Sequence, residues 1–157
     1  MLDYNKLAKS YDELHYKEQL EKVNLIIKEL KIKSENILDV GCGTALYSGL
    51  FKNYLGIDNS IGMIKNAHAN ILYGNAEDLP FKDNSFDIVI SISAVHNFND
   101  PNKAISEIRR VSKGKIAITL FKRSKKFEEI KSLIMDNFDV KEIENDKDVI
   151  YIGKIKK

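Results

Sequence analysis

The chain of 157 residues is long enough for one domain, which would bury about two-thirds of its unfolded surface. Its 25 basic and 23 acidic residues give a net charge of +2, too small to indicate nucleic-acid binding by itself. The single cysteine, Cys42, excludes an internal disulfide, and no Cys/His cluster has metal-ligand spacing, so we expect no metal. The longest apolar stretch, residues 88–95, is too short to span a membrane, and the charged N-terminus lacks the apolar core of a signal peptide. We therefore expect a cytoplasmic protein without a membrane segment.

The first part of the chain is predicted to be helical. Residues 3–17 are polar with interleaved tyrosines and indicate a short helix or an ordered lead-in. Residues 18–30 predict an amphipathic helix, because their apolar residues recur at helical spacing. These apolar residues are Leu20, Val23, Ile26, Ile27 and Leu30. We treat residues 1–34 as a helical lead-in to a sheet domain at residues 35–157, within a single domain.

From residue 35 onward, strand-like and helix-like segments alternate. The expected strands are Asn36–Val40, Tyr54–Ile57, Ile71–Tyr73, Phe86–Ile92 and Lys115–Phe121. The expected helices are Ala45–Lys52 with Thr44 as its cap, a helix after Ser60, one after Asp100 with Pro101 first, and Lys125–Asn137. Strand-like segments on either side of residues 145–148 predict a closing antiparallel hairpin. The pattern predicts an α/β fold: a mostly parallel seven-stranded sheet, helices on both faces and a C-terminal hairpin.

A glycine turn follows the first expected strand. Gly41 and Gly43 allow the backbone to turn tightly and approach a ligand, as in nucleotide-binding corners. A dinucleotide-binding turn requires a third glycine at position 46, where this chain has Leu46, and no Gly-Lys-Ser/Thr of a P-loop follows. Asp39, just before the turn, is unfavourable beside a pyrophosphate but suits a cation or amine. The turn therefore favours a phosphate-free, partly cationic nucleoside.

The stretch I-L-D-V-G-C-G-T-A at residues 37–45 resembles the first motif of the class I S-adenosylmethionine-dependent methyltransferases. Three later stretches resemble the family's further motifs in the proper order. They are L-G-I-D-N-S-I-G-M-I-K-N-A, G-N-A-E-D-L-P-F and F-D-I-V-I-S-I-S-A-V-H-N-F. The resemblance covers roughly residues 35–121 and is to the small, single-domain, type 11-like branch. It implies a Rossmann-like fold, the cofactor S-adenosyl-L-methionine and the product S-adenosyl-L-homocysteine.

The resemblance also implies which residues contact the cofactor. Asp58, at the end of the second strand, would accept hydrogen bonds from both ribose hydroxyls, although it could simply be a helix N-terminal charge. Asp39 would help to hold the amino-acid end. Gly41 and Gly43 would let the backbone run along the ribose and methionine moieties, with Cys42 as a small filler between them.

On the adenine side, Met63 would pack on the ring, or could simply belong to the core. Asn75 stands where the family usually has Asp for the adenine amino group, and the Ala76 amide would meet the adjacent ring nitrogen. Asn59 and Ser91 complete the expected cofactor contacts. Tyr11, in a Tyr-Asp pair like the family's N-terminal lid, could cover the cofactor or could serve packing instead.

Methyl transfer mainly requires alignment of the acceptor with the sulfonium methyl group. His96, just past the fourth strand, is the candidate general base, or else it only shapes the acceptor pocket. Ser93 and Asn97 are candidate polar groups on the acceptor side.

The short segment K-R-S-K-K after the fifth strand leaves no room for a substrate cap. We therefore expect a large acceptor, RNA or protein, or a partner subunit that completes the site, with a small molecule still open. Two other functions remain open. A catalytically inactive S-adenosylmethionine-binding regulatory module is one, because Asn75 and Ala45 depart from the family pattern. An NAD-dependent oxidoreductase, which Leu46 disfavours, is the other.

Overall fold

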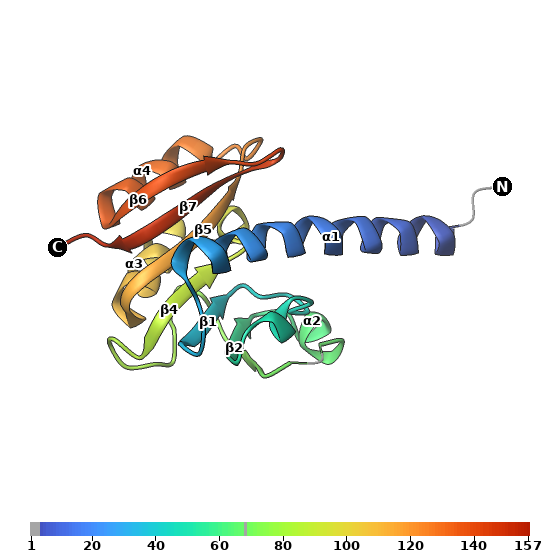
Figure 1. Ribbon diagram of the computed structural model, residues 1–157, viewed down its shortest axis with the longest axis horizontal. Helices are drawn as coiled ribbons and strands as arrows, with labels where there is room; N and C mark the ends of the chain where they lie inside the picture. Colours follow the sequence, from blue (N-terminus) through green and yellow to red (C-terminus); the bar gives the residue numbers. More distant parts are fainter. Residues whose placement is uncertain (1–3, 68) are drawn as a thin grey trace.

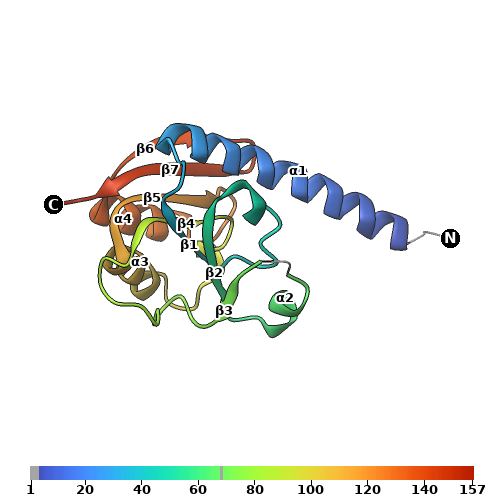
Figure 2. The same cartoon turned by 60° about the horizontal axis from the view of Figure 1, so that its bottom comes forward.

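A computed structural model describes residues 4–67 and 69–157, with side chains from residue 13 onward. The chain begins with one continuous helix, α1 (Tyr4–Leu30), rather than a separate lead-in and helix. No glycine or proline interrupts this stretch, so the helix extends through the polar residues at little cost once it has formed. The C-terminal part of α1 packs on the sheet through Val23, Ile26 and Leu30, while its N-terminal part projects beyond the body of the protein (Figures 1 and 2).

The seven strands form one sheet. They are β1 (Asn36–Val40), β2 (Asn53–Asp58), β3 (Ile71–Tyr73), β4 (Phe86–Ser91), β5 (Ser112–Phe121), β6 (Phe138–Glu144) and β7 (Asp148–Ile155). Their order is β3-β2-β1-β4-β5-β7-β6, with the first five parallel and β7 antiparallel to both of its neighbours. This arrangement confirms the predicted mostly parallel sheet with a closing hairpin and places β4 at its centre.

Helices cover both faces of the sheet (Figure 2). Successive strand residues point to opposite faces, so Ile37 and Ile88 pack under α1 while Leu38 and Val89 pack on the other side. The second face is covered by α3 (Pro101–Val111) and α4 (Phe127–Asn137). Among the described helices, none is both long enough and apolar enough to cross a membrane.

Two predicted helix caps are confirmed. Ser60 Oγ accepts the Met63 amide at 3.3 Å at the start of the short helix α2 (Ile61–Lys65). Asp100 Oδ1 accepts the Lys103 amide at 3.1 Å at the start of α3, whose first residue is Pro101.

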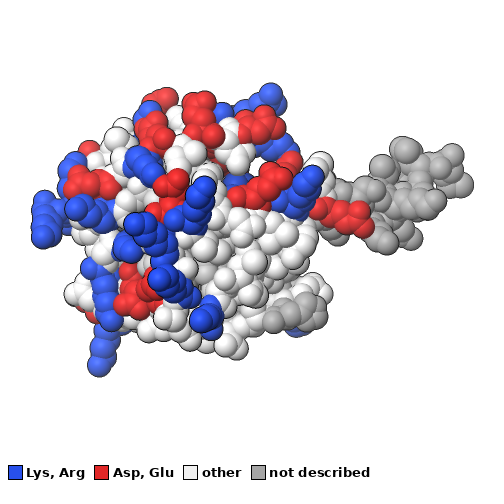
Figure 3. Space-filling view, in the orientation of Figure 1, with Lys and Arg blue, Asp and Glu red and all other residues white. Residues whose placement is uncertain are grey.

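The predicted helix Ala45–Lys52 is wrong, and Thr44 caps no helix. Ala45 has φ 53°, in the left-handed region, so a right-handed helix cannot begin there. Only a single 3-10 turn, η1 (Ser48–Leu50), forms between β1 and β2. The sheet face beside α1 is therefore left without a crossover helix, and this part of the surface, below α1 in Figure 3, carries few charged side chains.

Candidate functional site

A cavity of about 600 Å³ lies at the carboxyl ends of β1, β2 and β4. This is where the chain order of the parallel strands reverses direction, the usual ligand position in such sheets. The lining residues are His15, Gln19, Gly41–Tyr47, Ile57–Ser60, Met63, Gly74, Ala76, Ile92–Ala94, Asn97 and Phe98. A second hollow, of about 490 Å³, lies near the amino ends of these strands and contains none of the predicted site residues.

The glycine turn adopts a conformation that needs glycine. Gly41 has φ 75°, and a Cβ there would lie 2.7 Å from the Cβ of Ala94. Gly43 has φ 59°, but a Cβ there would meet no atom within 4 Å. Gly41 is therefore fixed by internal packing, whereas Gly43 leaves open space on the cavity side for a ligand.

Asp58 is held in a fixed orientation at the end of β2. Its Oδ2 accepts the Gly43 amide and its Oδ1 accepts the Ser60 amide, each at 2.9 Å. Each carboxylate oxygen keeps further acceptor capacity, so Asp58 can still receive two hydroxyl donors from a ligand in the cavity.

Asp39 lies beneath the glycine turn instead of on the cavity wall. It is 0% exposed, and its Oδ2 accepts the Tyr47 and Tyr54 hydroxyls at 2.6 Å each. Burial raises the pKa of Asp39 to about 6, although the two tyrosine hydrogen bonds lower it. Asp39 is therefore not part of the cavity wall, and its Oδ1 is buried without a partner among the described residues.

Four other expected contact residues, Cys42, Asn59, Met63 and Ala76, lie on the cavity wall. Burial raises the pKa of the Cys42 thiol, which agrees with a filler and not with a reactive nucleophile.

Two further expected contact residues, Ser91 and Asn75, do not lie on the wall. Ser91 is fully buried and donates its hydroxyl to the Val40 carbonyl at 2.9 Å, so it cannot reach a ligand. Asn75 is exposed and lies outside the lining set, although its neighbours Gly74 and Ala76 belong to it. The side chain of Tyr11 lies outside the described residues.

His96 is also absent from the cavity wall. It belongs to a 3-10 turn, η2 (Val95–Asn97), which directs Asn97 into the lining while the His96 ring packs at 5.6 Å from the Phe121 ring. Burial lowers the pKa of His96, and its Nδ1 is buried without a partner among the described residues. This position does not support the predicted role of His96 as a general base in the cavity.

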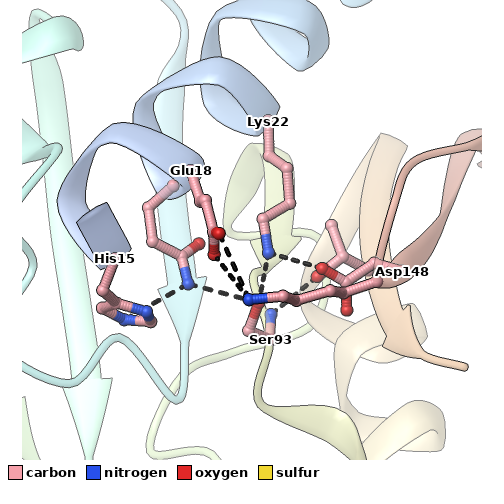
Figure 4. A network of polar contacts seen from close by, with 8 residues as sticks. His15, Glu18, Lys22, Ser93 and Asp148 are labelled. Carbon is pink, nitrogen blue, oxygen red and sulfur yellow. Dashed lines mark hydrogen bonds and ion pairs between the residues drawn. The ribbon is translucent and has the colours of Figure 1, made fainter. Parts of the chain in front are cut away.

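Helix α1 supplies two lining residues that the sequence did not indicate, His15 and Gln19. Gln19 Nε2 lies 3.4 Å from His15 Nε2 and donates to Ser93 Oγ at 3.3 Å (Figure 4). Lys22, one turn further along α1, donates to Ser93 Oγ at 2.8 Å and to Asp148 Oδ2 at 2.5 Å. A signal was present, because residues 19 and 22 share a helix face with Val23 and Ile26.

No group of three or more His, Cys, Asp or Glu side chains that could hold a metal ion occurs in the described part of the chain.

The sequence matches the family described as "Methyltransferase domain" over residues 38–118, more than half of the chain. The chain belongs to this family. An uncharacterised protein of Methanocaldococcus jannaschii is 38% identical over 115 residues, covering 70% of this chain and 46% of that protein. The uncharacterised methyltransferase YcgJ of Bacillus subtilis is 34% identical over 125 residues, covering 70% of this chain and 49% of its own. This methyltransferase-domain chain thus spans about half the length of these curated relatives.

A solved structure shares the fold of this methyltransferase-domain chain. It is a putative methyltransferase in complex with the Trm112 methyltransferase activator of Haloferax volcanii. The TM-score is 0.75, with 18% identity and 96% of each chain covered. This similarity and the sheet order agree with the Rossmann-like class I methyltransferase fold implied by the motifs.

The family implies the cofactor S-adenosylmethionine, and the residues of the cavity fit it. The cavity volume lies within the usual range of about 300–1,000 Å³ for small-molecule sites. Asp58 offers two oriented oxygens to a ribose, Gly43 leaves the space of a Cβ free, and Met63 offers an apolar contact to a ring. The Oε1 atom of Gln19 is buried without a partner among the described residues, so a ligand donor could satisfy it.

Proposed function

We propose that this chain is an S-adenosylmethionine-dependent methyltransferase that moves a methyl group to an acceptor bound at the open side of the cavity. The observation that carries the proposal is the placement of Asp58. The Gly43 and Ser60 amides hold its carboxylate at the end of β2, beside a glycine turn with open space over Gly43.

The protein's contribution to the reaction is binding and alignment. The bound cofactor supplies a methyl group already activated by its positive sulfur. Asp58 fixes the ribose, Met63 and Ala76 support the base, and the residues after β4 border the side from which an acceptor enters. Because His96 does not line the cavity, we expect an acceptor that needs no deprotonation by that residue.

The dinucleotide alternative is disfavoured by the turn itself. A pyrophosphate is normally bound at the N-terminus of the helix after the glycines. Here the left-handed backbone of Ala45 (φ 53°) prevents a helix from starting after the glycines, and only the 3-10 turn η1 follows. The inactive-module alternative rests on Asn75 and Ala45. Asp58, the expected ribose ligand, is nevertheless present and oriented at the cavity, which favours cofactor binding.

We further propose a macromolecular acceptor, RNA or protein, with a partner subunit completing the open side. The segment between β5 and α4 is a short turn without a cap over the cavity. The activator bound to the Haloferax volcanii neighbour supports the expectation of a partner. Two of the four basic residues of this turn are engaged within the protein, because Lys122 pairs with Glu144 and Lys126 donates to the Phe98 carbonyl, whereas Arg123 and Lys125 are exposed.

Calorimetric titration tests the cofactor proposal. We expect S-adenosylhomocysteine to bind the wild-type chain, and Asp58→Ala to weaken binding about 10-fold or more, because hydrogen bonds to a charged group are lost. Asp78→Ala, which removes an exposed carboxylate outside the cavity wall, is the control and should bind as the wild type does. NAD binding more tightly than S-adenosylhomocysteine would refute the proposal.

The acceptor requires a second experiment. Cofactor labelled on its methyl group would be offered to a fractionated cell extract with the wild-type chain and with Asp58→Ala. We expect label in an RNA or protein fraction with the wild-type chain only. Label in small molecules alone would refute a macromolecular acceptor while leaving the methyltransferase proposal intact.

A further inference from the structure

A polar cluster joins α1, the segment after β4 and the start of β7 at the edge of the cavity (Figure 4). Lys22 and Asp148 are 6% and 3% exposed, although they lie 126 residues apart in the chain. Ser93 links this ion pair to the cavity, because it contacts Lys22 and also lines the cavity. Its backbone has φ 53°, and its amide donates to Thr119 Oγ1 at 2.6 Å. The conformation is unfavourable for serine and is held by its neighbours, which is typical of functional positions.

The hydrogen bonds of Ser93 leave one donor unused. Its hydroxyl oxygen accepts from Lys22 Nζ and from Gln19 Nε2, which occupies both lone pairs. What remains is the hydroxyl hydrogen, which has no acceptor among the described residues. The ammonium of Lys22 polarises this hydroxyl and strengthens it as a donor.

The same cluster leaves one acceptor unused. Gln19 is 6% exposed and lines the cavity, and its Oε1 has no partner in the described part of the protein. A buried amide oxygen without a partner costs free energy that a ligand donor would recover. Ser93 and Gln19 thus present a free donor and a free acceptor on neighbouring side chains.

Ser93 and Gln19 lie where the amino-acid end of the cofactor would be if its ribose is bound by Asp58. Asp58 ends β2 and Ser93 follows β4, with β1 and the glycine turn between them. Two strand spacings separate these sites by about 10 Å. A nucleoside with its ribose on Asp58 and its chain across the turn would extend toward Ser93. S-adenosylmethionine carries a carboxylate and an ammonium group at that end.

No lysine or arginine occurs among the described lining residues, and Asp39 is sealed beneath the turn. We infer that Ser93 and Gln19 bind the amino-acid end of the cofactor, an inference that rests on the proposed function. The Ser93 hydroxyl donates to the carboxylate, and Gln19 Oε1 accepts from the ammonium group. Lys22 is a positioning residue, which polarises Ser93 and, through Asp148, fixes α1 against β7.

Calorimetry with three related ligands tests this assignment. The ligands are S-adenosylhomocysteine, its decarboxylated analogue and 5′-methylthioadenosine, which lacks the whole amino-acid end. We expect wild-type protein to prefer S-adenosylhomocysteine over the decarboxylated analogue by about 10-fold or more. Ser93→Gly should abolish most of that preference and leave 5′-methylthioadenosine binding unchanged. Glycine is chosen because it accepts φ 53° without strain.

Three further variants separate the roles. Gln19→Leu should reduce the preference for the decarboxylated analogue over 5′-methylthioadenosine, because the partner of the ammonium group is lost. Lys22→Met, combined with Asp148→Asn to leave no buried charge, should reduce the carboxylate preference, while Lys22→Arg should retain part of it. Ser106→Ala, an exposed serine on α3, is the control that should bind like the wild type.

The outcomes are distinguishable. An unchanged carboxylate preference in Ser93→Gly overturns the inference while the proposed function stands. An equal loss for all three ligands also overturns it, because it would indicate general damage to the cavity. If the wild-type chain binds none of the three, the proposed function fails and the inference fails with it.

Discussion

The buried carboxyl group of Asp39 should make stability depend on pH in an unusual direction. Burial raises its pKa from an ordinary 3.8 to about 6, so the folded chain binds this proton more tightly than the unfolded chain does. The stabilisation is fully present below pH 3.8 and is lost as the pH rises through about 6. At about 1.4 kcal/mol per pH unit, the loss amounts to about 3 kcal/mol.

Asp39→Asn isolates this effect, because asparagine does not titrate and can still accept the tyrosine hydrogen bonds. Urea unfolding followed by far-UV circular dichroism would give the free energy of unfolding of both proteins between about pH 4 and pH 7. The stability of the wild type relative to Asp39→Asn should fall by about 2.4 kcal/mol over that range, because part of the full effect is already lost at pH 4.

Asp87→Asn is the matched control, because the stability contribution of Asp87 changes with pH in the opposite direction to that of Asp39. The Asn36 amide lowers the pKa of Asp87, so its contribution is present above the unfolded value and is lost as the pH falls. A difference between wild type and Asp39→Asn that stays constant with pH would refute the argument. Tyr54→Phe gives a second check, since loss of its hydrogen bond should move the transition to higher pH.

Three further predictions concern stability and reactivity. Lys22→Met should lower the free energy of unfolding by about 3–5 kcal/mol in urea titrations, because Asp148 is left buried and unpaired; Lys22→Met with Asp148→Leu should recover most of it. Gly41→Ala should cost at least about 2 kcal/mol, from left-handed backbone strain and the contact with Ala94, whereas Gly49→Ala should stay within about 0.5 kcal/mol; equal losses would contradict this account. Cys42 should resist iodoacetamide in the folded protein and react in urea, as followed by mass spectrometry; rapid labelling of the folded chain would be inconsistent with its burial.

The sequence was sufficient wherever a local pattern determines the structure. The bounds of β1 and β3, the Ser60 and Asp100 caps and the C-terminal hairpin all followed from short-range periodicity, capping residues and turn composition. The glycine turn and Asp58 could also be placed at one site, because the carboxyl ends of neighbouring parallel strands meet.

The remaining features depend on contacts that no local pattern records. Ala45 has a left-handed backbone, so a turn forms where a helix was expected. The turn η2 places Asn97 on the cavity wall and His96 away from it. Lys22 shares a helix face with the buried residues Val23 and Ile26, but a lysine at such a position is usually solvated. Its burial depends on Asp148, and a single sequence does not show that two residues this distant form a pair.

The separation between Lys22 and Asp148 also orders the steps of synthesis. On the ribosome, α1 emerges before β7, and the carboxylate that neutralises the buried lysine of α1 is added only after another 126 residues. Until the terminal hairpin emerges, docking α1 on the sheet would bury an unpaired ammonium group, which is strongly unfavourable. The helix should therefore stay undocked on the nascent chain, and the wall that it contributes to the cavity should close only when β7 completes the sheet.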